Sequence, residues 1–251
     1  MSILVDRLQR LGQIERTGFG FGASAQQKKV PTILVGVIRV DDDTVSEDSA
    51  DFLVLDSCPD NTQISSLNNQ QSIWGMFVGS DHRITADQAE KIGADFLIVT
   101  DEYASASIIL ENDLANGFLI DRELNENRAK AIDAIGFDFL ILDGKSVEMP
   151  LTIGSVLDIQ EQLTRYSAHA LLRLDQIPDA ESLEIFRDLG ISGILLNDSE
   201  LKDGDLKSLR STIADIQPKK NNGNIGASLP NSEQLADTYD EFEEDSAHQQ
   251  H

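Results

Sequence analysis

The sequence is poor in cysteine and has no long apolar run. Its single cysteine, Cys58, excludes an internal disulfide and a zinc cage built from cysteines. No stretch reaches the roughly 18–20 consecutive apolar residues that cross a bilayer. The charged start, MSILVDRLQRLGQIER, also lacks the apolar block of a signal peptide. We therefore expect a soluble, cytoplasmic protein.

Positive charge is also scarce. The chain has 20 Lys and Arg residues against 44 Asp and Glu residues, which gives a formal net charge of −24. Nucleic-acid phosphates and anionic membranes are bound by clusters of Lys and Arg, so a surface this acidic repels both. We expect no nucleic acid and no membrane as partner. A small-molecule ligand stays open, and composition does not indicate the oligomeric state.

One short phrase recurs along the chain. SADFLVLDS at 49–57 returns as GADFLIVTD at 93–101 and as GFDFLILDG at 136–144. Each copy holds a continuous apolar run, which is typical of parallel strands buried on both faces. Amphipathic segments that end in glycine precede the strands, for example TADQAEKIG at 85–93 and NENRAKAIDAIG at 125–136. Their pattern predicts helices with a left-handed glycine cap.

Repeated units of helix, glycine, buried strand and polar turn predict an α/β fold with a parallel sheet. Eight strands can be counted, which is the number in a (β/α)8 TIM barrel, and the chain resembles that superfamily in repeat and order only. An open doubly wound sheet is the structural alternative. The predicted strands are 33–38, 52–55, 74–78, 96–99, 118–120, 139–142, 170–174 and 193–196.

Three regions follow from this count. Residues 1–29 are predicted as a helix over 2–15 and a glycine-rich cover segment, residues 30–217 as the barrel, and residues 218–251 as a disordered acidic tail. The GFGFG phrase precedes the first strand, so it is not placed as a phosphate-cradling loop. The segment NTQISSLNNQQS after the second strand has a weak helical pattern.

The turns after the last two strands bear on cofactors. Many TIM barrels hold a phosphate there with glycine-rich turns. Here the turns carry four acids, which repel phosphate, so we expect neither FMN nor a sugar phosphate at that place. These acids are Asp175, Asp179, Asp198 and Glu200.

Carboxylates follow most of the predicted strands and converge at the carboxyl end of a barrel. Asp121 and Asp143 are candidate catalytic acids, and Asp101 is a candidate ligand of Mg²⁺ or another hard cation. Aspartate is also favoured before helices as a cap, which is the alternative reading of each residue.

Lys145 follows the sixth strand in the phrase LDGKS, which lacks the first glycine of a P-loop. The layout resembles that of the Schiff-base aldolases, a TIM-barrel family with an imine-forming lysine on the sixth strand. The resemblance implies that Lys145 polarises a substrate or forms an imine. Its place beyond Asp143 favours a solvated loop lysine instead.

Arg122, Arg173 and His82 complete the candidate site. The two arginines lie at the ends of the fifth and seventh strands and could clamp an anionic group. His82, after the third strand, is a candidate general base. These residues predict small-molecule binding at an acidic barrel mouth, with metal-assisted, lyase-like chemistry as one form. The alternative is a catalytically silent barrel that acts as a scaffold, so the sequence leaves open whether the protein is an enzyme.

Overall fold

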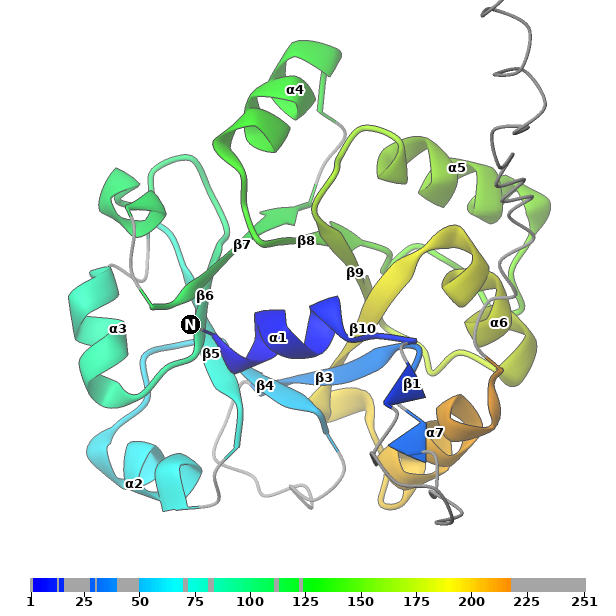
Figure 1. Cartoon of the computed structure of the whole chain (residues 1–251), viewed down its shortest axis with the longest axis horizontal. Helices are drawn as coiled ribbons and strands as arrows, with labels where there is room; N and C mark the ends of the chain where they lie inside the picture. The colour runs from blue at the N-terminus through cyan, green and yellow to red at the C-terminus, as the bar shows by residue number, and fades with distance from the viewer. Residues whose placement is uncertain are drawn as a thin grey trace, which may run out of the picture. The chain divides into compact units, whose positions relative to one another are not determined.

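The computed structural model describes residues 2–12, 14–15, 28–29, 31–39, 50–69, 72–80, 84–110, 113–121 and 124–217. Eight parallel strands close into a barrel in the order β10-β3-β4-β5-β6-β7-β8-β9, with helices outside (Figure 1). The (β/α)8 TIM barrel is thereby confirmed. The strands are β3 (Leu34–Arg39), β4 (Phe52–Leu55), β5 (Trp74–Val78), β6 (Phe96–Val99), β7 (Ala115–Ile120), β8 (Phe139–Asp143), β9 (His169–Leu174) and β10 (Ile191–Asn197).

Alternate residues of each strand face opposite sides, because side chains of a strand alternate with a period of two. One set fills the barrel, where Phe52, Phe96 and Phe139 pack edge to face with ring centroids 5.9 and 5.8 Å apart. The other set packs against the surrounding helices, for example Leu140 and Leu142 of β8. Burial on both faces explains why the strands read as continuous apolar runs.

The helices begin and end where the sequence predicts caps. Thr85 caps α3 through a capping box, Asn125 caps α4, and left-handed glycines end both helices. The 3-10 helix η2 (Ala106–Ile109) lies between β6 and β7, and η3 (Asp198–Glu200) follows β10. The longer elements are α3 (Ala86–Ile92), α4 (Glu126–Ile135), α5 (Ile153–Leu163), α6 (Ala180–Leu189) and α7 (Asp205–Asp215).

Helix α2 (Asn61–Asn69) corrects the expectation that NTQISSLNNQQS forms a poor helix. Asp60 starts it. Its carboxylate accepts from the backbone N–H of Thr62 and Gln63, and the Gln63 side chain accepts from the Asp60 N–H. This reciprocal pair satisfies the first N–H groups of the helix. Among the helix residues whose burial is described, only Leu67 is fully buried, which is why the apolar pattern of the helix is weak.

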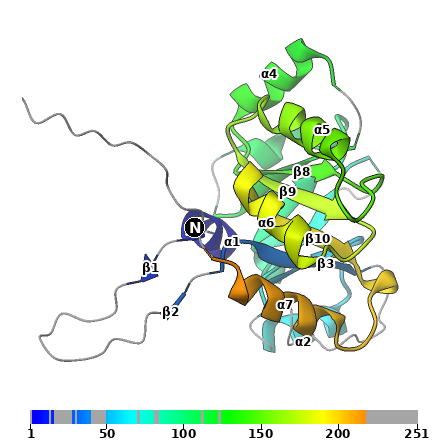
Figure 2. The same ribbon diagram turned by 90° about the vertical axis from the view of Figure 1, so that its right-hand side faces the viewer.

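Helix α1 (Ile3–Gln9) is shorter than the predicted helix over 2–15. Gly12, with φ of +66°, lies where the chain turns, and its N–H donates to Pro31. The helix lies across one end of the barrel (Figures 1 and 2), and Leu4 and Leu8 pack into the interior cluster. The Asp95 carboxylate accepts from the N–H groups of Ile3 and Leu4 and fixes its start. It thus closes the end opposite the strand carboxyl ends.

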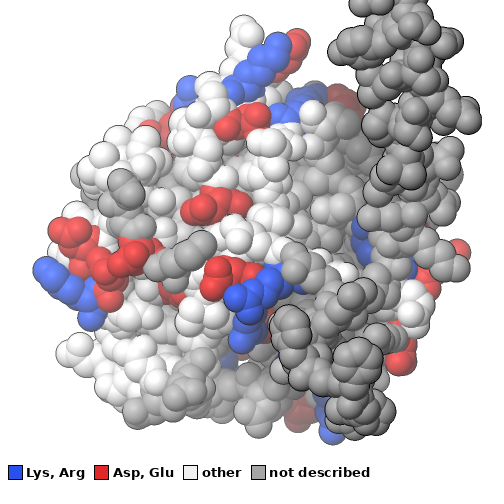
Figure 3. Space-filling view, in the orientation of Figure 1, with Lys and Arg blue, Asp and Glu red and all other residues white. Residues whose placement is uncertain are grey.

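The remaining segments are described by themselves. The short strands β1 (Ile14–Glu15) and β2 (Lys28–Lys29) pair antiparallel. The chain divides into two units, residues 1–219 and 220–251, and the second unit and the GFGFG segment lie outside the described residues. No helix within the described ranges is long and apolar enough to cross a membrane. On the α1 face, acidic and basic side chains lie side by side (Figure 3).

Candidate functional site at the mouth of the barrel

The side chains at the carboxyl mouth follow from the alternation of each strand. The position two residues beyond the last buried inward-facing residue continues the inward row at the rim. On β4 this row runs from Val54 to Asp56, and on β9 from Leu171 to Arg173. The same rule places Gly79, Thr100, Asp121, Asp143 and Asn197 around the rim.

A cavity of about 180 Å³ opens at this mouth. Phe77 and Leu119 belong to the interior cluster and form its apolar floor. Five further residues line it: Asp56, Gly79, Thr100, Asp101 and Arg173. Five strands or strand ends therefore contribute to one site, and the structure brings the predicted residues Asp101 and Arg173 together in it.

Arg173 is the cation of the cavity. Its Nη2 donates to Asn197 Oδ1 at 3.3 Å, and the Asn197 amide donates to Asp175 Oδ1 at 3.2 Å. The Arg173 Nε atom is buried and has no hydrogen-bond partner among the described residues. A buried donor without a partner is costly, so a ligand that accepts from it gains free energy on binding.

Asp101 ties two strand ends together. Its carboxylate accepts from the Ser80 N–H at 2.8 Å, the Ser80 hydroxyl at 2.9 Å and the Tyr103 N–H at 2.8 Å. These hydrogen bonds, that of the Ser80 backbone first, lower the pKa of Asp101. A side chain at Gly79 would collide with Asp101 and Thr100, so glycine is required where the two ends meet.

The three predicted catalytic residues lie at neighbouring strand ends. Asp121 is exposed after β7, and Asp143 is half-buried at the end of β8, beside Arg173 in the strand register. The Asp143 carboxylate accepts from the Lys145 N–H at 3.2 Å. Lys145 itself is exposed in the loop, as the solvated reading expects. None of the three lines the 180 Å³ cavity as described.

Two predicted residues, His82 and Arg122, lie outside the described residues. A third strand-end arginine, Arg39, forms an ion pair with Asp198, with Nε and Oδ2 3.9 Å apart. Arg173 is thus the only strand-end arginine of the described part that lines the mouth cavity.

Three of the four acids of the last two turns, Asp175, Asp179 and Asp198, have structural partners. Asp179 caps α6 by accepting from the Ser182 N–H at 2.8 Å, and this backbone hydrogen bond lowers its pKa. Asp175 accepts from Asn197, and Asp198 pairs with Arg39. Asp175, Asp179 and Asp198 thus serve as hydrogen-bond or ion-pair partners within these turns.

Sequence reasoning did not single out Asp56 and missed Gly79, Thr100 and Asn197. The sequence did contain a signal, the alternation of side chains along a strand. Each of these four residues lies two positions after an apolar residue that points into the barrel. Among the described residues, no group of three or more His, Cys, Asp or Glu side chains is placed to hold a metal ion. The cavity is therefore lined by one cation, Arg173, and by two carboxylates, of which Asp101 already accepts hydrogen bonds from Ser80 and Tyr103.

The chain matches no protein-family model and no curated protein. Its fold is similar to that of solved barrel enzymes. Thiamine phosphate pyrophosphorylase from Pyrococcus furiosus is 12% identical, with a TM-score of 0.52, over 72% of this chain and 96% of that one. 3-Keto-L-gulonate-6-phosphate decarboxylase from Vibrio cholerae is 13% identical, with a TM-score of 0.55, over 72% and 97%. A mutant tryptophan synthase alpha-subunit from Pyrococcus furiosus is 10% identical, with a TM-score of 0.52, over 73% and 96%. At these identities the likeness establishes the TIM-barrel fold alone.

Proposed function

We propose that this barrel binds a small hydroxycarboxylate at its mouth. The observation that carries the proposal is the buried Arg173 Nε without a described partner, in a cavity of about 180 Å³. A guanidinium binds a carboxylate through strong, charge-assisted hydrogen bonds. The Asp56 carboxylate accepts a hydroxyl of the same ligand and selects against a second anionic group.

Lyase-like chemistry is the form of activity that this site supports best. Asp121 and Asp143 extend the rim next to the cavity, and we assign them proton transfer to and from the bound ligand. Lys145 adds a cationic group at the same end. Arg122 and His82, also candidates from the sequence, lie outside the described residues. Metal assistance has less support, because three N–H or O–H donors already occupy the Asp101 carboxylate.

The test is binding of DL-glycerate, followed by ligand-detected NMR, to wild type, Arg173→Gln and Arg10→Gln. Loss of the charge-assisted hydrogen bonds should weaken glycerate binding by about tenfold or more in Arg173→Gln. Arg10→Gln, an exposed arginine next to α1 at the other end, is the matched control and should bind as wild type. Equal binding by Arg173→Gln and wild type would show that the proposal is wrong. A melting-temperature rise with Mg²⁺ that Asp101→Asn removes would favour the metal-assisted form.

A scaffold without chemistry is the second candidate. The observation in its favour is that much of the rim charge is already engaged: Arg39 with Asp198, and Arg173 with Asn197. A scaffold gains nothing from the free Arg173 Nε. If neither glycerate nor glycerol binds and Arg173→Gln raises the melting temperature, the scaffold is the better account.

A further inference from the structure

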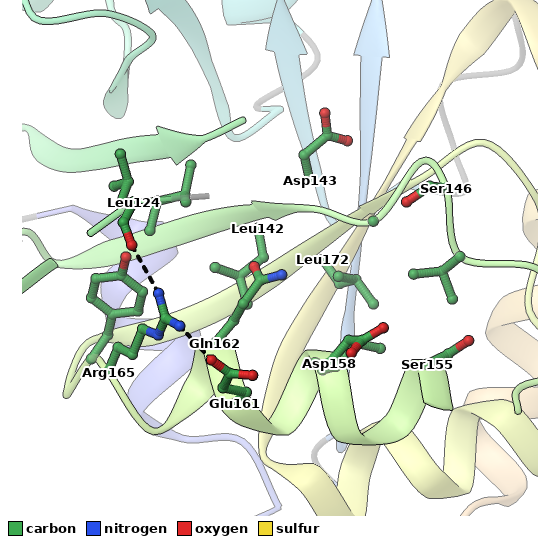
Figure 4. Close-up of a pocket in the computed structure, with 15 residues that line it drawn as sticks. Leu124, Leu142, Asp143, Ser146, Ser155, Asp158, Glu161, Gln162, Arg165 and Leu172 are labelled. Atoms are coloured by element: carbon green, nitrogen blue, oxygen red, sulfur yellow. Dashed lines mark hydrogen bonds and ion pairs between the residues drawn. The ribbon is translucent and has the colours of Figure 1, made fainter. Parts of the chain in front are cut away.

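A second cavity, of about 350 Å³, lies outside the barrel wall, between the strands and helix α5 (Figure 4). Small-molecule sites commonly enclose about 300–1,000 Å³, so its size suits a ligand. The cavity borders Asp143 and Gly144 at the end of β8, but the Asp143 carboxylate points away from Asp158 and Ser155 (Figure 4). It is therefore a site separate from the mouth.

The floor of the cavity is apolar. Ile120, Leu142 and Leu172, the outward-facing residues of three adjacent strands, are all buried beneath it. Helix α5 covers this floor loosely, because Ile159 is its only fully buried residue. A hydrocarbon group placed on the floor would remove apolar surface from water, which favours binding.

The polar wall carries a negative charge that is open to a ligand. Asp158 and Gln162 on α5 and Ser146 in the preceding loop line the cavity, and their side chains have no hydrogen-bond partner among the described residues. The one cation of the wall, Arg165, is engaged: its Nη1 donates to the Leu124 carbonyl at 2.9 Å and its Nη2 to Glu161. An anionic ligand would find no free cation here.

Tyr166 adds a neutral hydroxyl at the other end of the cavity. Burial raises the pKa of Tyr166, so the phenol keeps its proton at neutral pH. The cavity thus combines an apolar floor, neutral hydrogen-bonding groups and one free carboxylate. A carboxylate that loses water on ligand binding needs a cation in return.

We propose that this cavity binds a small primary amine with a short hydrocarbon body. The ammonium group donates to Asp158, and the hydrocarbon body lies on Leu142 and Leu172. This site is independent of the proposed function, since it shares no binding group with the mouth cavity.

The experiment uses three probes of equal length: n-hexylamine, 1-hexanol and hexanoate. Binding to the full chain is followed by saturation-transfer NMR and titration. Wild type should bind hexylamine about tenfold more tightly than hexanol, because the ammonium group adds the attraction of opposite charges to the hydrogen bond that either probe can donate to Asp158. Hexanoate should not bind. Asp158→Asn should reduce hexylamine affinity to that of hexanol.

Two further variants complete the design. Glu184→Gln removes an exposed acid of the neighbouring helix α6 and should leave the hexylamine affinity unchanged. Ser146→Trp, at an exposed loop position, should block the cavity and abolish binding of all probes while the melting temperature is kept. The proposal is overturned if wild type binds no amine, if hexanoate binds as well as hexylamine, or if Asp158→Asn or Ser146→Trp binds hexylamine as wild type does.

Discussion

Single residues at the two ends of the barrel have different tasks. At the mouth, Arg173 retains a donor that the fold does not use, whereas at the other end Asp51, Asp95 and Asp138 each have hydrogen-bond partners that hold the fold together. Asp51 is an example: its buried carboxylate accepts from the Val35 N–H at 2.9 Å and pairs with Arg210 at 2.7 Å. Thr32 and Asn116 also have a buried polar side-chain atom without a hydrogen-bond partner in the described part, but neither residue lines the mouth cavity as Arg173 does. The place of the unused Arg173 donor is the residue-scale reason to place ligand binding at the mouth.

The pKa of His169, at the start of β9, should make the stability of the protein depend on pH. Burial lowers its pKa below the usual 6.5, against a smaller opposing effect of Asp138. Below about pH 6.5 the unfolded chain therefore binds more protons at this residue than the folded chain does. Its contribution to stability is present above pH 6.5 and is lost as the pH falls through the folded pKa.

His169→Gln removes this titration. The melting temperature of the variant should fall less steeply between about pH 7 and pH 5 than that of wild type. Thermal melts of both proteins across this range provide the measurement. Parallel curves would mean that His169 titrates alike in the folded and unfolded chains.

At the scale of elements, the agreement between sequence and structure depends on burial. The bounds of β4, β5 and β6 are those predicted from the sequence. An uninterrupted apolar run between polar turns indicates a strand that is buried on both faces, and its ends mark the ends of the strand. Helix α2 was predicted only weakly, because Leu67 is the one buried residue among its described side chains and its start depends on the capping pair Asp60 and Gln63, a signal that the sequence does contain.

The candidate site was less accessible to sequence reasoning for a physical reason. The alternation of side chains along a strand tells which residue points to the mouth. Asp56 and Thr100 could therefore have been identified from the sequence as residues of the mouth. Ion pairs between side chains of different strand ends cannot be predicted in this way. Arg39 and Asp198 are distant in the sequence, and nothing near either residue indicates that they meet.

Helix α1 should contribute to stability as the closure of one barrel end. Leu4 is fully buried in the interior cluster, whereas Ile3 is 54% exposed. Leu4→Ala should lower the free energy of unfolding by about 2–5 kcal/mol, the usual cost of a large-to-small change in a core. Ile3→Ala, the matched control, should change it by less than about 0.5 kcal/mol. Urea unfolding of wild type and both variants measures these free energies of unfolding. If Leu4→Ala changed the free energy of unfolding no more than Ile3→Ala does, α1 would lie outside the cooperative fold.

For the whole molecule, the barrel should fold without residues 218–251. Their sequence has no apolar periodicity with which to join a core. A chain that ends at residue 217 should melt within about 4 °C of the full chain. A larger fall would mean that this segment contributes to barrel stability.

The central claim, that the carboxyl mouth of this TIM barrel binds a small carboxylate, is tested most directly by amide chemical shifts. Glycerate is titrated into the ¹⁵N-labelled full chain, and the shifted backbone amides are assigned. We predict that they cluster at the ends of β4, β5, β6 and β9, around Asp56, Gly79, Thr100 and Arg173. Shifts confined to the α1 end, or no shifts at saturating glycerate, would contradict the account.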